Sequence, residues 1–318
     1  MEQGQALTGY GQMISNAIAD GWNHMTSLLF RQFSLGRWIT LAFLAWMAKL
    51  GAGGGGSFNS LGNFGSGGTG AGAEAMQGVA GWIQANLPLV IIIATVGGVI
   101  AMGIWVLCLW ISSRGKFMFL NSVVCNVTKV REPWNRFRQV GNSLFLWRLT
   151  FWIIALLAFA VVAGIFGGAL AALQQQTALM VIVVAICAVL FILLLLTVTV
   201  ILTLLQDFII PLMYRYEMRA WSAWGYGMNL ITTHWKGFLL FLLVRVAAAI
   251  GLGIAAAVFV GVVGLLTCCT AWLLMVIPVV GGVLAMALTL PVPVFMRLFS
   301  VYFLQQFHPD YRMTALAE

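Results

Sequence analysis

Long apolar runs without a charged side chain dominate this sequence and limit what the chain can fold into. Residues 88–111 form one such run of 24 residues, and residues 149–173 and 178–205 form two more. A helix needs about 20 residues to cross a bilayer, because each residue adds about 1.5 Å and the hydrocarbon is about 30 Å thick. Only residues 174–177 join the last two runs, so these runs are expected to form an antiparallel helical hairpin across a membrane.

The composition agrees with a membrane protein. Of the 318 residues, 62% are hydrophobic and only 8% are charged, with a mean hydropathy of +1.01, whereas a soluble domain is about 25% charged. We therefore expect an all-α, polytopic membrane bundle with interfacial amphipathic helices on its cytoplasmic side. Its six predicted spans are residues 35–53, 88–111, 149–173, 178–205, 237–263 and 272–293.

The first and last of these spans depart from a simple crossing helix. Residues 35–53 are short and carry Lys49 near their end, so a re-entrant or interfacial helix is the alternative to a full crossing. Pro291 and Pro293 should kink or break the last span and leave residues 294–307 as a separate amphipathic tail helix.

Three parts make up the predicted organisation of the chain: an interfacial segment over residues 1–34, a membrane domain over residues 35–307 and a cytoplasmic tail over residues 308–318. Within the membrane domain, the glycine-rich residues 51–73 form an outer loop and residues 112–148 form a basic inner elbow. In the first part, a helical stripe joins apolar residues at spacings of three and four, namely Ile14, Ile18, Trp22, Met25 and Leu29.

The positions of the basic residues predict the orientation in the membrane. The net charge is +8, and fourteen of the sixteen Lys and Arg residues lie in four segments that alternate with the spans: 1–37, 113–148, 207–236 and 297–318. The three intervening outer loops hold none. Because cytoplasmic loops are enriched in Lys and Arg, both termini are expected in the cytoplasm, with the protein in a bacterial inner membrane. This alternation argues against nucleic acid as a partner and favours anionic lipid.

The basic inner elbow supplies most of the candidate lipid contacts. Trp134, Phe137, Val140 and Leu144 fall on one helical stripe with arginines beside it, which is typical of a cationic amphipathic helix at a membrane surface. We predict that anionic lipid contacts three arginines and one tryptophan of this segment, namely Arg131, Arg136, Arg138 and Trp134.

Arg245 is a further candidate because it lies inside the predicted span 237–263. An intramembrane arginine is expected either to bind an anion or a lipid phosphate, or to be neutralised by a protein group. Asp207 is the predicted partner in the second case, and broken-helix carbonyls near Pro211 or Pro291 are the alternative.

A weak internal repeat is visible in the tryptophans. Three times, a tryptophan in an interfacial segment is followed 13 to 16 residues later by one that opens a span: Trp22 and Trp38, Trp134 and Trp147, Trp221 and Trp235. The chain would then contain three copies of an interfacial helix and a helical hairpin. Chance is an equally good explanation, since tryptophan is generally enriched at membrane interfaces.

One family resemblance rests on the motifs of the basic elbow and the segment after the hairpin. Residues 112–120, Glu132-Pro-Trp134, residues 141–147 and Asp207-Phe-Ile-Ile-Pro211 resemble an uncharacterised bacterial family of polytopic membrane proteins. That family is distantly similar to the membrane region that precedes some glycerophosphodiester phosphodiesterases. The resemblance implies a helical membrane bundle and carries over no catalytic residue.

The residues themselves point to no reaction. The sequence lacks G-x-S-x-G, H-E-x-x-H and paired carboxylates, and its five cysteines have no metal-ligand spacing. We therefore expect no enzyme, metal or cofactor, and a structural, partner-binding or lipid-interacting role, with transport of a small anionic or lipid-like solute as the alternative. Small-residue motifs such as Gly164-x-x-x-Gly168 leave open contact with other membrane proteins or a second copy.

Overall fold

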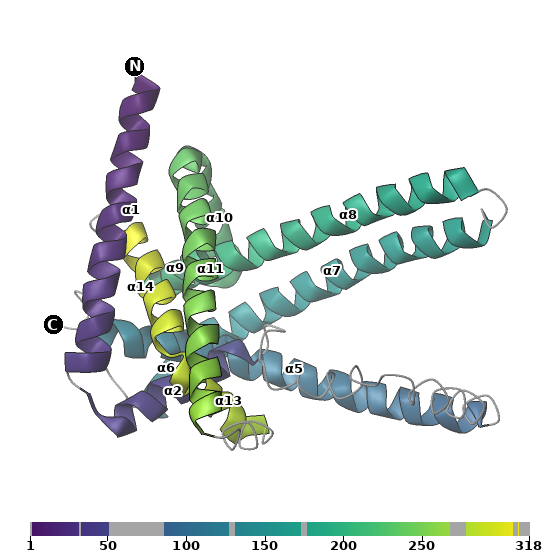
Figure 1. The fold of residues 1–318 in the computed structure, drawn as a ribbon, viewed down its shortest axis with the longest axis horizontal. Helices are drawn as coiled ribbons and strands as arrows, with labels where there is room; N and C mark the ends of the chain where they lie inside the picture. Colours follow the sequence, from purple (N-terminus) through teal and green to yellow (C-terminus); the bar gives the residue numbers. More distant parts are fainter. Residues whose placement is uncertain are drawn as a thin grey trace. The chain divides into compact units, whose positions relative to one another are not determined.

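The computed structural model describes residues 2–31, 33–50, 86–126, 131–172, 177–267, 278–307 and 311. These residues are almost entirely helical and contain no strand, so the predicted all-α class is confirmed. The helices are α1 (Glu2–Thr26), η1 (Ser27–Arg31), α2 (Leu35–Lys49), α5 (Leu87–Cys125), α6 (Arg131–Arg136), α7 (Arg138–Ala172), α8 (Thr177–Leu204), η3 (Leu205–Ile209), α9 (Ile210–Tyr216), α10 (Ala220–Thr233), α11 (Trp235–Leu266), α13 (Pro278–Leu288) and α14 (Pro291–Gln305). Figure 1 shows these helices with their labels.

Four described helical stretches are long and apolar enough to cross a membrane: Leu87–Cys125, Arg138–Ala171, Leu179–Tyr216 and Trp235–Leu266. Within the most apolar 18 residues of each stretch, no more than 6% are buried by the rest of the protein. Such an uncovered apolar surface is typical of a helix that lipid surrounds. The bent pair α13 and α14 could add a fifth crossing.

The described residues therefore support four or five crossings rather than the predicted six. The predicted first span corresponds to α2, which has 15 residues and buries one side against protein. Leu41, Leu44 and Met47 on that side are buried. α2 is therefore too short to match the other spans, which favours the interfacial or re-entrant alternative.

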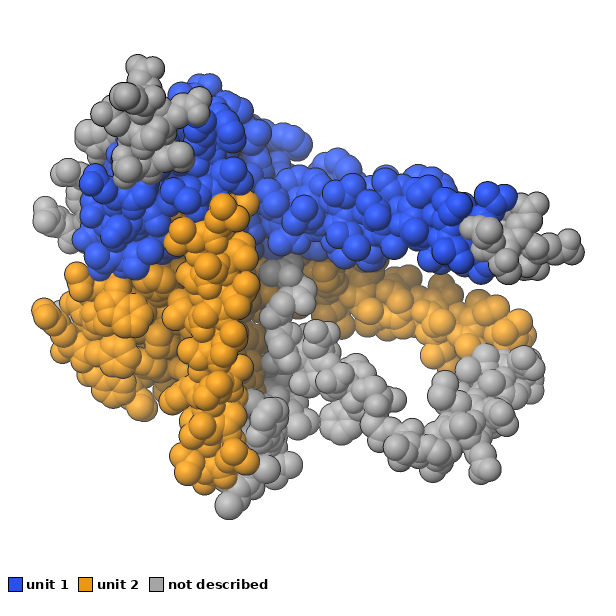
Figure 2. Space-filling view, turned by 45° about the horizontal axis from the view of Figure 1, so that its top comes forward, with its two compact units in different colours: residues 1–20, 138–240, 299–318 blue, residues 21–137, 241–298 orange. Residues whose placement is uncertain are grey.

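The chain forms two compact units, coloured separately in Figure 2. Unit 1 consists of Met1–Asp20, Arg138–Leu240 and Phe299–Glu318, and unit 2 of Gly21–Phe137 and Phe241–Leu298. Each unit therefore combines segments that are far apart in the sequence. The three-part organisation expected from the sequence stays a prediction.

In unit 1, α7 and α8 form the predicted hairpin, and they run side by side away from the rest of this unit (Figure 1). The helix of α8 does not stop at residue 205, where the predicted span ends. It continues through the π-helical turn η3 into α9 and ends at Tyr216. Proline lacks the N–H of a regular helical hydrogen bond, and the π turn just before Pro211 accommodates that loss within a continuous helix.

In unit 2, the inner half of α5 packs against α2, and α2 also packs against α13. The approach of α5 to α2 is close at Gly115, where a Cβ would lie 3.1 Å from the Ala48 nitrogen. Beside it, the Ser112 hydroxyl donates a hydrogen bond of 2.8 Å to the Ala48 carbonyl. Residues 112–124, predicted to belong to a basic inner elbow, are therefore a buried continuation of the span helix.

A proline break separates α13 from α14, which meet at an angle of 66°. The break comes before Pro291, where Thr289 and Leu290 leave the helix, so the predicted break is confirmed but lies a few residues earlier than expected. Pro291 cannot donate to the carbonyl of Ala287, four residues before it. The indole Nε1 of Trp38 in α2 donates to that carbonyl instead, at 2.9 Å.

The predicted amphipathic helix around residues 133–144 differs from the observed structure in two ways. The helix is interrupted at Phe137, between α6 and α7. Phe137, Val140 and Leu144 are buried in protein, so this stripe is not free to enter a bilayer.

In α1, the predicted stripe is only partly buried, since Ile18 and Trp22 are exposed. The glycine-rich loop, Cys268 and Cys269 lie outside the described residues.

Candidate lipid-headgroup site on α5 and α6

An arginine held between two tryptophans is the central feature of the candidate site in unit 2. The guanidinium carbon of Arg114 lies 4.3 Å from the ring centroid of Trp110, one turn earlier in α5, and 5.0 Å from that of Trp134 in α6. The two indoles meet edge to face, with centroids 6.0 Å apart and planes at 86°. Both distances are within the range of cation–π attraction, which is strongest for tryptophan. Arg114 is only 6% exposed.

Local sequence explains how these three groups come together. Trp110 and Arg114 are four residues apart and therefore lie on one face of α5. α5 ends at Cys125 and is followed by Asn126, whose backbone is left-handed (φ 54°), as is common at helix C-termini. Arg37 at the start of α2 donates a hydrogen bond to the Asn126 side chain, which fixes this end of the helix to α2. α6 follows and contributes Trp134.

Exposed arginines lie on the same short helix as Trp134. Arg131 and Arg136, two of the predicted contact residues, are exposed at the two ends of α6. The guanidinium of Arg136 also lies 5.5 Å from the ring centroid of Phe137. Arg138, also exposed, begins α7 and belongs to unit 1. The structure thus groups Trp134, Arg131 and Arg136 on α6, and it adds Arg114, which is not among the predicted contact residues.

The signal for Arg114 was present in the sequence as the Trp110 to Arg114 spacing of four residues. The lipid contacts predicted for the basic inner elbow all lie in residues 131–138 and leave Arg114 out. Arg114 also contacts Trp134 of α6, and helical periodicity within α5 does not contain that contact.

Charge is distributed unequally between the two units. Unit 2 holds ten Lys and Arg residues against two Asp and Glu residues, whereas unit 1 holds six of each. The whole net charge of +8 therefore belongs to unit 2. Among the described residues, four cations are buried, namely Arg114, Lys116, Arg148 and Arg297, and Asp207 is the only buried carboxylate.

Asp207 and Arg245, the predicted ion pair, are in different units. Asp207 is buried in η3 of unit 1. Arg245 is half-buried in α11 of unit 2, ten residues after the helix begins at Trp235, or about 15 Å along its axis. Each of the two makes at least one interaction in the described part of the chain. Their pairing stays a prediction.

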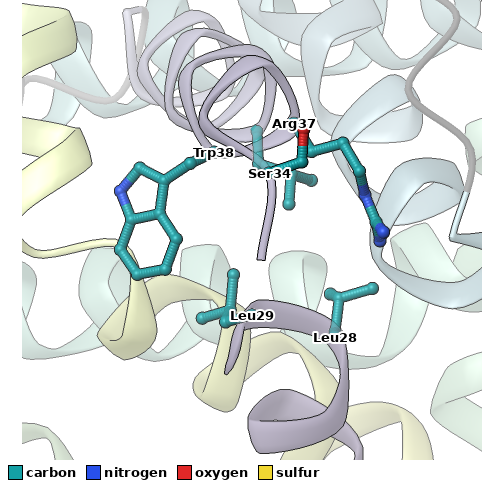
Figure 3. Close-up of a pocket in the computed structure, with 6 residues that line it drawn as sticks. Leu28, Leu29, Ser34, Arg37 and Trp38 are labelled. Atoms are coloured by element: carbon teal, nitrogen blue, oxygen red, sulfur yellow. The ribbon is translucent and has the colours of Figure 1, made fainter. Parts of the chain in front are cut away.

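A small hollow lies beside α2 in unit 2 (Figure 3). It is lined by Leu28, Leu29, Ser34, Arg37, Trp38 and Leu41. Arg37 and Trp38 lie on opposite sides of it in Figure 3, and both are engaged elsewhere, with Asn126 and the Ala287 carbonyl. The hollow therefore presents mostly leucine side chains to an incoming group.

No set of three or more His, Cys, Asp or Glu side chains among the described residues is arranged to hold a metal ion.

The fold and its exposed apolar helices define a multi-span helical membrane protein. The chain belongs to a family of unknown function (DUF7544), whose profile matches residues 14–314. No curated protein and no solved structure matches the sequence. The similarity to the membrane region of glycerophosphodiester phosphodiesterases stays a prediction.

Proposed function

We propose that this membrane protein binds the headgroups of anionic lipids at α5 and α6 and catalyses no reaction. The observation that carries the proposal is Arg114 between Trp110 and Trp134, with Arg131 and Arg136 exposed on the helix that supplies Trp134. Tryptophan is typical of the headgroup level of a membrane, and arginine binds phosphate through several N–H donors. The net charge of unit 2 supports the same ligand, because basic residues near a membrane surface attract anionic lipids.

We further propose a bacterial inner membrane as the location, with α6 and both termini on the cytoplasmic side. The concentration of Lys and Arg in residues 113–148, against none in residues 173–177, supports this orientation. Impermeant thiol reagents on intact cells test it, because Cys125 should be protected while Cys268 and Cys269 are modified. Modification of Cys125 with protection of the other two would reverse the orientation.

Lipid binding can be tested by native mass spectrometry of the protein in mixed phosphatidylglycerol and phosphatidylcholine. Each basic residue near the surface contributes about 1 kcal/mol, so the double variant Arg131→Gln with Arg136→Gln should reduce the preference for the anionic lipid about tenfold or more. The control changes two exposed arginines of other elements, Arg31→Gln with Arg219→Gln, and removes the same charge. An equal loss in both double variants would mean that net charge alone attracts the lipid.

Transport of a small anionic or lipid-like solute is the second candidate, and the half-buried Arg245 in a candidate span favours it. Anion uptake by proteoliposomes, compared between the wild type and Arg245→Met, tests it directly. If Arg245 instead pairs with Asp207, then Arg245→Met and Asp207→Asn should each lower the melting temperature, and the double variant should recover much of the loss.

A further inference from the structure

The helix α10 differs from the other helices of unit 1 in which of its residues it buries. Ala220, Ala223 and Gly227, all small, form its buried side. At Gly227 a Cβ would meet the side chains of Ile209 and Leu212, so this side packs closely on η3 and α9. Large apolar residues point outward instead: Trp221 is 65% exposed and Met228 is 42% exposed.

The outward surface of α10 has two chemically different flanks. Trp221 and Met228 are seven residues apart, or about two turns, and therefore lie on one flank. Ser222 and Asn229 have the same spacing and form the next flank, about 100° further around the axis. Both of these residues are exposed. The outward surface of α10 is thus divided lengthwise into an apolar and a polar flank.

The position of α10 in the chain places it at a membrane surface. The candidate span Leu179–Tyr216 ends three residues before α10, and the candidate span Trp235–Leu266 begins one residue after it. A segment between two consecutive crossings has both ends on the same side of the bilayer. Trp235 is 57% exposed, with the Lys236 ammonium 5.7 Å from its ring centroid. Trp and Lys at the start of a span are typical of the interface.

The other two tryptophan pairs show that this arrangement is specific to α10. In the second pair Trp134 is half-buried and Trp147 is buried, where it stacks on Trp224 with centroids 5.0 Å apart. In the first pair the Trp38 indole is bonded to the Ala287 carbonyl. Only in the third pair, Trp221 and Trp235, are both indoles exposed.

We infer that α10 is an interfacial membrane helix whose flank of Trp221 and Met228 enters the boundary between headgroups and acyl chains, while the flank of Ser222 and Asn229 faces water. The occupant of the apolar flank is lipid, because the two adjoining spans hold α10 at the bilayer and an indole combines an apolar body with a polar N–H. This inference requires only that the two spans cross, and it does not depend on the arginines of α6.

The test compares neighbouring positions on the two flanks in the full-length protein. A variant with its five native cysteines replaced receives a single cysteine at Met228 or at Asn229, labelled with bimane, in vesicles of phosphatidylcholine alone. Lipid with a nitroxide near the headgroup should quench the label at position 228 several-fold more than the label at position 229. Aqueous iodide should show the reverse order. Trp221→Cys and Ser222→Cys provide a second matched pair.

Two results would overturn the inference. Equal iodide quenching at positions 228 and 229 would place both flanks in water. Failure of both quenchers at position 228 would mean that protein, such as a second copy of the chain, covers the apolar flank. Hydroxyl-radical footprinting of the wild-type protein needs no substitution, and in vesicles it should oxidise Trp221 and Met228 several-fold more slowly than in the unfolded chain. Neutral lipid separates this test from the anionic lipid preference proposed for α6.

Discussion

The two halves of α5 have opposite relations between polarity and exposure. From Leu87 to Leu107 the helix is apolar, and most of its side chains are exposed. From Ser112 to Val124 it carries Arg114, Lys116 and Asn121, and every residue is buried. A soluble protein would show the reverse. The outer half of α5 therefore obtains its apolar surroundings from lipid, whereas the inner half obtains them from α2 and other protein.

The largest effect is expected from the removal of a ring in the inner half. Phe117 is fully buried and stacks on Phe137 with centroids 6.0 Å apart, so Phe117→Ala should lower the free energy of unfolding by about 3–5 kcal/mol. Ile104→Ala in the exposed outer half should change it little. Thermal unfolding in detergent measures both. Similar losses in the two variants would show that the outer half is also packed against protein.

A smaller effect is expected when a side chain is added to a glycine of α5. Gly115→Leu should destabilise the protein by about 1–3 kcal/mol, because its Cβ would press on the backbone of Met47 and Ala48. Gly103 has no described atom near its Cβ position, so Gly103→Leu is the matched control. The same thermal assay applies, and a neutral Gly115→Leu would contradict the close approach of α2 to α5.

A third prediction concerns the charge that the inner half buries. Trp134→Leu should cost about 0.5–2 kcal/mol of stability because it removes one of the two indoles over the Arg114 guanidinium. Trp134→Phe should recover part of that loss. In the background Arg114→Met, the cost of Trp134→Leu should shrink. An unchanged cost in that background would mean that Trp134 stabilises by packing alone.

The smallest effect is expected from pH. Burial lowers the pKa of His24 in α1 below its usual value of 6.5. The unfolded chain therefore binds this proton more readily than the folded protein, so the free energy of unfolding should fall as the pH drops through about 6.5. His24→Gln should remove part of this fall, as measured by melting temperatures between about pH 5 and pH 8. A pH dependence identical to the wild type would assign the effect to other groups.

The sequence was sufficient for the outer halves of the long helices and insufficient for the inner half of α5. Residues 88–111 could be assigned from their own side chains, because lipid surrounds a span whatever the rest of the chain does. In the inner half, the local sequence gives no sign that Arg114 and Lys116 are buried, since charged side chains are normally exposed. Their burial follows from contacts with segments far away in the sequence, which a local pattern does not encode.

The candidate site was predictable to a similar extent. Arg131, Arg136 and Trp134 were found because basic and aromatic residues alternate near the end of a span. Periodicity correctly predicts one apolar stripe that contains Phe137, Val140 and Leu144. It wrongly predicts that the stripe faces the membrane, because periodicity identifies an apolar face and does not distinguish protein from lipid as its neighbour. Arg114 is not among the predicted contacts, because its position beside Trp134 depends on a contact between two helices.

The bond from Trp38 to the Ala287 carbonyl also has a consequence for the synthesis of the chain. The two residues are 249 positions apart. At a ribosomal rate of about 5–20 residues per second, the acceptor is made roughly 12 to 50 s after the donor. During that interval α2 lacks the element that completes its contacts. Final placement of α2 is therefore a late step, which must await the translation of α13.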